Sequence, residues 1–147
     1  MPAKRTSFAG LTLVLPKHWS DITDSLGEGM PFTLARTDGI GALQFSVAHY
    51  KKGQLPNIDA KTLRNFLDGL FEGQGFGRPK NSSDWSVSDE LAGVQGDHID
   101  GAVQTRAWYV SDGRNIALVT YTTEHRTRPH SKVELIACES IVRSIRF

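Results

Sequence analysis

The feature of this sequence that most constrains the fold is a pair of β-rich runs joined by one tight turn. The stretch AVQTRAWYVSDGRNIALVTYTTE, residues 102–124, carries alternating side chains on both sides of Asp112 and Gly113. Aspartate followed by glycine favours the two-residue turn of a β-hairpin, and β-branched and aromatic residues favour strands. We therefore predict a long antiparallel hairpin in this part of the chain.

Shorter strand-like runs lie closer to the N-terminus. Residues 11–15, 30–37 and 42–50 alternate apolar and polar side chains, as expected of half-buried strands. An Asp-Gly pair in TDGIG, between the last two runs, predicts a second hairpin. Residues 85–90 and a few positions around Val94 are shorter candidates in a polar segment rich in turn formers. The strands thus come in runs that hairpins can join.

Two segments change to a helical period. In residues 59–73, Asp59 is the expected N-cap and glycines follow the last apolar residue. One face of this helix is apolar: Leu63, Phe66, Leu67, Leu70 and Phe71. A capping box formed by Ser131 and Glu134 predicts a second helix that frays near Arg143. Its apolar side is formed by Leu135, Cys138, Ile141, Val142 and Ile145.

Strands in runs together with two amphipathic helices predict the α+β class. We expect an antiparallel β-sheet flanked by two main amphipathic helices, which cover one or both of its faces. A length of 147 residues suits a single domain over residues 1–147.

Charge and composition make several classes of function improbable. Seventeen lysine and arginine residues balance 16 acidic residues, for a formal charge of +1, so no basic face points to nucleic acid. No run of about 18 apolar residues predicts a membrane span. The N-terminus has no apolar stretch typical of a signal peptide, so we expect a cytoplasmic protein.

No motif in the chain is typical of a particular enzyme activity. The glycine-rich GQGFGR, residues 73–78, follows a predicted helix, whereas a dinucleotide fingerprint follows a strand. Asp97, His98 and Asp100 in GDHIDG offer ligands to a cation, but this string is also ordinary turn chemistry, which we favour. Residues 125–132, HRTRPHSK, could hold an anion before a helix, and we favour a solvated loop there. We therefore expect no cofactor, no metal site and no catalytic residues.

The sequence suggests one binding site. In the long hairpin, Arg106 and Trp108 share one face, and an exposed Trp–Arg pair is the composition of a binding hot spot. The alternative is that a helix covers that face and Trp108 belongs to the core, which we favour because a layered domain must bury something there. Candidate partner-binding residues are Trp108, Arg106 and Tyr121 on the following strand. Cys138 is expected to be a buried structural thiol, because it lies in an apolar helix stripe.

Several landmarks of the chain resemble the PsbP-like fold, and most closely its bacterial DcrB-like and Eag-type branch. They are GLTLVLPKHWSDIT with Pro16 and Trp19, the FTLAR and LQFSVAHY strands, RAWYVSDGRNIALVTYTT, and the ending IVRSIRF with Ser144 and Phe147. The resemblance implies an antiparallel sheet flanked by helices, as a PsbP-like sandwich, without enzymatic activity. Such relatives act as chaperones or adaptors, and those of the Eag type bind effectors of type VI secretion and clasp apolar segments.

These observations predict a non-catalytic protein-binding module, of secretion-effector chaperone or adaptor type or of toxin-immunity type. The expected partner is another protein, a secreted effector or toxin, and the oligomeric state, including a homodimer, stays open. The alternative is a small-ligand-binding protein or hydrolase-like enzyme with a pocket near His98 or His18. That alternative requires polar groups that converge on a closed pocket.

Overall fold

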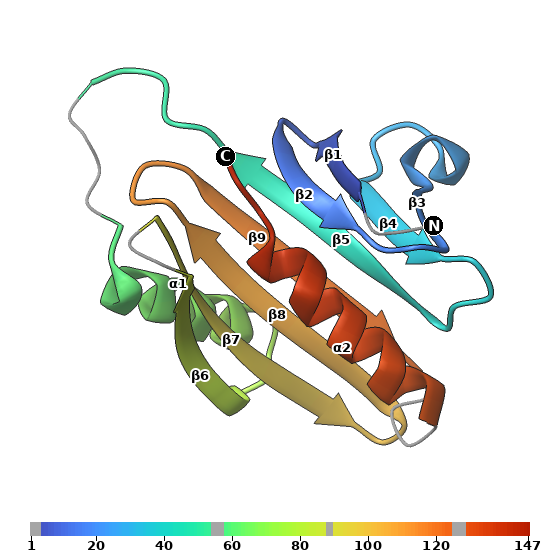
Figure 1. Cartoon of the computed structure of the whole chain (residues 1–147). Helices are drawn as coiled ribbons and strands as arrows, with labels where there is room; N and C mark the ends of the chain where they lie inside the picture. Colours follow the sequence, from blue (N-terminus) through green and yellow to red (C-terminus); the bar gives the residue numbers. More distant parts are fainter. Residues whose placement is uncertain (1–3, 54–57, 88–89, 125–128) are drawn as a thin grey trace.

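A seven-stranded antiparallel sheet forms the centre of the molecule (Figure 1). The computed structural model describes residues 4–53, 58–87, 90–124 and 129–147. In the sheet the strands follow the order β3-β4-β5-β9-β8-β7-β6. Their bounds are β3 (Trp19–Asp21), β4 (Phe32–Arg36), β5 (Gly41–Ala48), β6 (Lys80–Val87), β7 (Leu91–Asp100), β8 (Val103–Ser111) and β9 (Ile116–Thr123). The large antiparallel sheet and two α-helices confirm the predicted α+β class.

The two α-helices lie on opposite faces of this sheet. Helix α2 (Pro129–Arg143) packs over β9 and β5, and α1 (Ala60–Gly73) packs over β7 and β8 on the other face (Figure 1). A separate hairpin of β1 (Lys4–Phe8) and β2 (Leu11–Leu15) lies beside α2 and shares its hydrophobic core. We call the two sides the α2 face and the α1 face.

Strand alternation sorts the side chains between the two faces. On the α2 face, Trp108 lies opposite Val119, which in turn lies opposite Phe45. These residues join one large core with the buried side of α2 and with the β1–β2 hairpin. On the α1 face, the alternate residues Val94 and Ala107 pack against α1 in a second, smaller core, to which the helix contributes Leu63, Leu67 and Phe71.

The sequence predicted the start of α1 and the end of α2 correctly, but not the start of α2. The Asp59 carboxylate accepts a hydrogen bond from the Thr62 amide at 2.9 Å, so the predicted N-cap is confirmed. The predicted capping box is wrong, because α2 already begins at Pro129 and Ser131 is buried inside the helix. Arg143 ends α2 as predicted.

The strands depart from the sequence prediction at both ends of the sheet. Strands β1 and β3 were not predicted, because a five-residue and a three-residue strand leave little periodic signal. Strands β6 and β7 are longer than predicted, since polar residues at this end pair along the backbone in spite of weak strand propensity. The chain end forms a short antiparallel bridge between Arg146 and Thr12.

The corner that follows β2 is structural. Trp19 donates its amide hydrogen to the Pro16 carbonyl at 3.2 Å, and His18 between them has a positive φ of 73°. The Trp19 side chain is buried in the core of the α2 face, so it anchors this corner to the core. His18 itself is exposed.

Candidate functional site

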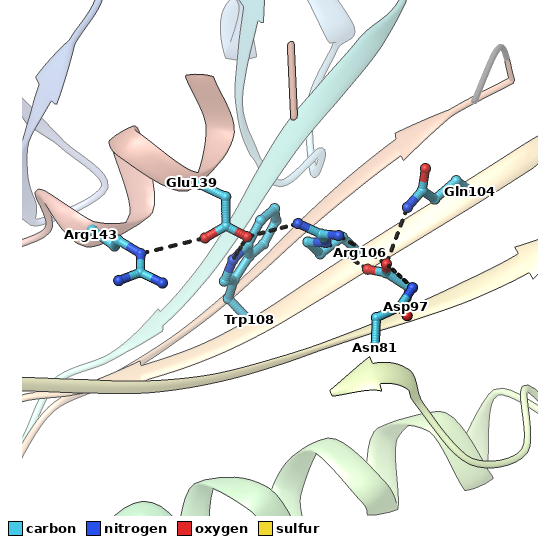
Figure 2. A network of polar contacts seen from close by, with 7 residues as sticks. All are labelled: Asn81, Asp97, Gln104, Arg106, Trp108, Glu139 and Arg143. Carbon is cyan, nitrogen blue, oxygen red and sulfur yellow. Dashed lines mark hydrogen bonds and ion pairs between the residues drawn. The ribbon is translucent and has the colours of Figure 1, made fainter. Parts of the chain in front are cut away.

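An ion-pair network lies where β6, β7 and β8 meet α2 (Figure 2). Arg106 on β8 donates two hydrogen bonds to Asp97 on β7, from Nε to Oδ1 at 2.6 Å and from Nη2 to Oδ2 at 2.9 Å. Asn81 and Gln104 donate to the same Oδ2 at 3.1 and 3.2 Å. The Asp97 carboxylate is 1% exposed, and four donor groups from three neighbouring residues replace the water that burial removes.

The same arginine connects the sheet to α2. Arg106 Nη1 donates to Glu139 Oε1 at 2.9 Å, and the Trp108 indole donates to that oxygen at 3.3 Å (Figure 2). Arg143 lies one helical turn further along α2, with its Nε 3.6 Å from Glu139 Oε2. Because one guanidinium holds a carboxylate on each side, the network fixes α2 over the sheet.

The network explains how the charge of Arg106 on β8 is balanced inside the fold. Burial by itself lowers the pKa of Arg106, but the hydrogen bonds and charges of Asp97 and Glu139 raise it above its ordinary value. The arginine therefore stays charged and bound to both carboxylates. Asp97 is thus an ion-pair partner of Arg106, and its two oxygens are already occupied by protein donors.

The three predicted partner-binding residues are parts of the interior. Trp108 is fully buried beneath α2, which confirms the core alternative and shows that no exposed Trp–Arg pair exists on this face. Tyr121 is also buried, and the Arg106 side chain is 16% exposed. A partner could touch Trp108 or Tyr121 only after α2 moved, because α2 covers both. The accessible contact surface of this conformation lies elsewhere.

A second buried carboxylate, that of Glu134, lies beside Tyr121. Glu134 of α2 accepts hydrogen bonds from the Tyr121 hydroxyl at 3.0 Å and from the amide of Ile40 at 2.8 Å. It also accepts one from the Gly41 amide at 3.3 Å, so it binds the turn between β4 and β5. Burial, and then the neighbouring Glu134 charge, raise the pKa of Tyr121 well above its ordinary value. Sequence reasoning assigned Glu134 to a capping box, and only the tertiary contacts show this role.

The two histidines of the alternative function lie in different settings. His18 is exposed in the corner after β2, whereas His98 on β7 stacks on Phe76, with ring centroids 3.9 Å apart and planes 7° apart. In the described part of the chain, no group of three or more metal-ligating side chains comes together. Residues 125–128 of the basic segment HRTRPHSK lie outside the described residues.

Cys138 is buried in the core of the α2 face, as predicted. Burial raises the pKa of its thiol, and the nearby carboxylates of Glu134 and Glu139 raise it further. A thiol with a raised pKa carries little thiolate near neutral pH, and the thiolate is the nucleophilic form. Cys138 is therefore a packing residue.

An open groove lies on the α1 face, beside the part that α1 covers. Polar residues of three adjacent strands contribute to its floor: Thr105, Thr120, Thr122, Gln44 and Ser46. Apolar residues of the same strands lie among them: Ala107, Leu118 and Phe45. A cavity of about 200 Å³ lies against the Leu70 and Gln74 side of α1, and one of about 130 Å³ lies against Pro31. Thr120 lines both cavities, so they adjoin at this residue, and we call the two together the open groove.

The groove floor could have been found in the sequence. Thr120 and Thr122 alternate with Val119 and Tyr121, which belong to the core of the α2 face. Alternation therefore assigns the threonines to the opposite face. What the sequence did not show is that α1 would leave these strands accessible.

Among the described residues, neither α-helix is long and apolar enough to cross a bilayer. No protein-family model matches the chain, and no curated protein matches it in sequence.

Proposed function

We propose that this chain is a non-catalytic protein-binding module with a PsbP-like sandwich fold, which acts in the cytoplasm. Its partner is another protein, of the secreted effector or toxin kind, so the module serves as an effector chaperone or adaptor or as an immunity protein. The resemblance of the landmarks from Pro16 to Phe147 supports this class, as does an antiparallel sheet with a helix on each face.

The open groove on the α1 face carries the proposal. Its floor offers hydroxyl and amide groups, and small side chains allow the backbone of a partner to approach closely. Apolar side chains are exposed near both ends. Phe66 of α1, which contacts Tyr109, is 44% exposed, and Met30, which precedes Pro31, is 45% exposed. A mixed floor of hydroxyl, amide and apolar groups, with exposed apolar side chains nearby, suits a protein segment.

The charged groups of the interior support a non-catalytic role. Asp97, Arg106 and Glu139 bind one another, and the oxygens of Asp97 have no capacity left for a substrate proton. General acid–base catalysis needs a titrating group within reach of a bound substrate. Of the two candidate histidines, His18 is exposed in the corner after β2, whereas His98 lies next to the groove, because it is opposite Thr105 of the floor and stacks on Phe76 of the cavity wall. The turnover measurement below therefore tests the alternative of a pocket near His98.

Affinity capture from the native cell tests the proposal. The tagged full chain is compared with a Thr120→Arg variant, which places a long cation on the groove floor, and with Ile136→Arg as the matched control. Ile136 lies on the outer side of α2 and is 71% exposed, so its substitution leaves the groove intact. We expect one protein, identified by mass spectrometry, to be captured by the wild type and the control and lost by Thr120→Arg.

The captured protein is then purified and titrated into each variant by calorimetry. Binding that Thr120→Arg weakens about tenfold or more, with unchanged melting temperature, supports the groove as the contact surface. Equal affinity for all three chains would show that the partner binds elsewhere. Turnover of a small substrate by the wild type would contradict the non-catalytic assignment.

A further inference from the structure

The two edges of the central sheet differ in length. At one edge, β3 has three residues, Trp19–Asp21. At the other, β6 has eight, Lys80–Val87, and its residues 83–87 pair regularly with β7. No described strand pairs with the outer side of β6. An edge strand turns every second amide and carbonyl away from its neighbour, and these groups can pair with another extended chain.

A cavity lies beside this edge. It has a volume of about 630 Å³ and lies on the outer side of α1, away from the open groove. Helix α1 contributes Asp68 and Glu72, and β6 contributes Ser82. The segment between them forms the remaining wall: Gly75, Gly77, Arg78 and Pro79. An extended segment laid along β6 would therefore have α1 as a side wall.

The cavity is more acidic than basic. Asp68 and Glu72 are exposed one helical turn apart, where like charges repel, and neither forms an ion pair within the described residues. Arg78 is the single cation that lines the cavity. In contrast, Asp84 in the middle of β6 already pairs with Arg64 of α1. A cationic side chain that enters between Asp68 and Glu72 would relieve their repulsion.

We propose that β6 and the outer side of α1 bind an extended segment of a partner protein by strand addition, with a lysine or arginine of that segment in the acidic cavity. The backbone groups of β6 supply the hydrogen bonds of the added strand, and Asp68 and Glu72 select the basic residue. This surface lies across α1 from the open groove, so it is a second contact site beyond the one proposed above.

Nuclear magnetic resonance on the isotope-labelled full chain tests this site directly. The probe is a capped peptide of about seven residues in which valine and threonine alternate around a central lysine. We expect its addition to shift the amide signals of β6 residues 83–87 and of Asp68 and Glu72. A peptide with a central glutamate should bind more weakly, and one with alternate N-methylated backbone amides should not bind, because it cannot extend the sheet.

Matched charge variants measure the contribution of the carboxylates. The double variant Asp68→Asn/Glu72→Gln should weaken the lysine peptide about threefold or more. The double variant Asp24→Asn/Glu28→Gln, which removes two exposed carboxylates elsewhere at the same spacing, should leave the affinity unchanged. Thr120→Arg should also leave it unchanged, so failure of the groove and failure of this edge can be told apart.

Three results would overturn the proposal. The first is an absence of signal changes on β6 at millimolar peptide. The second is equal binding of the lysine and glutamate peptides. The third is a dimer of the chain, detected by light scattering, whose interface is β6 and which prevents the peptide from binding. The β6 edge would then pair with a second copy of the chain.

Discussion

The two faces of the central sheet show how differently one set of strands can be used. On the α2 face, a helix and a hairpin close over Trp108 and Tyr121, and the carboxylates of Glu134 (buried) and Glu139 (half-buried) bond the helix to the sheet. On the α1 face, the helix leaves a row of threonines accessible beside it. This contrast underlies the proposal made above, in which the α2 face supplies stability and the α1 face supplies surface for contacts.

Replacement of Trp108 by alanine should give the largest effect and tests this division most directly. The side chain is fully buried, so we expect Trp108→Ala to lower the free energy of unfolding by about 4 kcal/mol in urea titrations. The matched change Thr120→Ala, on the other face of the next strand, should cost less than about 1 kcal/mol. Similar losses for the two variants would contradict the contrast between the faces.

Two ion pairs provide the second test. Asp97→Ala leaves Arg106 without its buried carboxylate and should cost about 3 kcal/mol in the same measurement. Asp84→Ala removes the exposed pair with Arg64 on the α1 face and should cost at most about 1 kcal/mol. If Asp97→Ala is as mild as Asp84→Ala, the buried Asp97–Arg106 pair stabilises the fold no more than the exposed pair does.

Alkaline pH should affect the α2 face through Cys138. Burial raises the pKa of this thiol above its ordinary value of 9.0. The Cys138 thiol of the unfolded chain therefore loses its proton at a lower pH than that of the folded chain. Above about pH 9 the folded chain binds more protons than the unfolded chain, so the free energy of unfolding falls as the pH rises. One such group contributes at most about 1.4 kcal/mol per pH unit. Urea titrations from pH 7 to 10 should show the fall, and Cys138→Ala should reduce its slope. An unchanged slope would mean that another group is responsible.

The smallest effect concerns two glycines. A methyl group at Gly69 of α1 would meet nothing within 4 Å, so Gly69→Ala should stabilise the chain by about 0.5–1 kcal/mol. At Gly93 a methyl group would overlap the Trp85 ring, so Gly93→Ala should destabilise. Melting temperatures that move in the same direction would contradict this difference.

Features that depend on residues close together in the sequence could be predicted, whereas features that depend on distant residues could not. The caps and turns that depend on a few neighbours, such as Asp59 and the Asp112-Gly113 turn, could be placed from the sequence. The role of Glu134 could not, because its partners Ile40 and Tyr121 lie far away in the chain. A glutamate three residues after a serine fits a capping box as well as a buried bridge, and only burial distinguishes the two.

The candidate site shows the same limit. Alternation places Arg106 and Trp108 on one face and Thr105 on the other, and this assignment is correct. It does not say which face is exposed, because that depends on where each helix packs. The sequence suggested Trp108 as either core or contact surface, and the position of α2 decided for the core.

The sequence by itself determined the α+β class, the two hairpins around Asp-Gly turns, the apolar stripes of both helices and the faces of the strand residues in the long hairpin. These features arise from backbone periodicity and turn geometry, which neighbouring residues set. Only the tertiary structure decided that the helices take opposite faces, that Asp97 and Glu139 share Arg106, and that a groove and a strand edge remain accessible. Those outcomes depend on packing between distant segments, which no local pattern encodes.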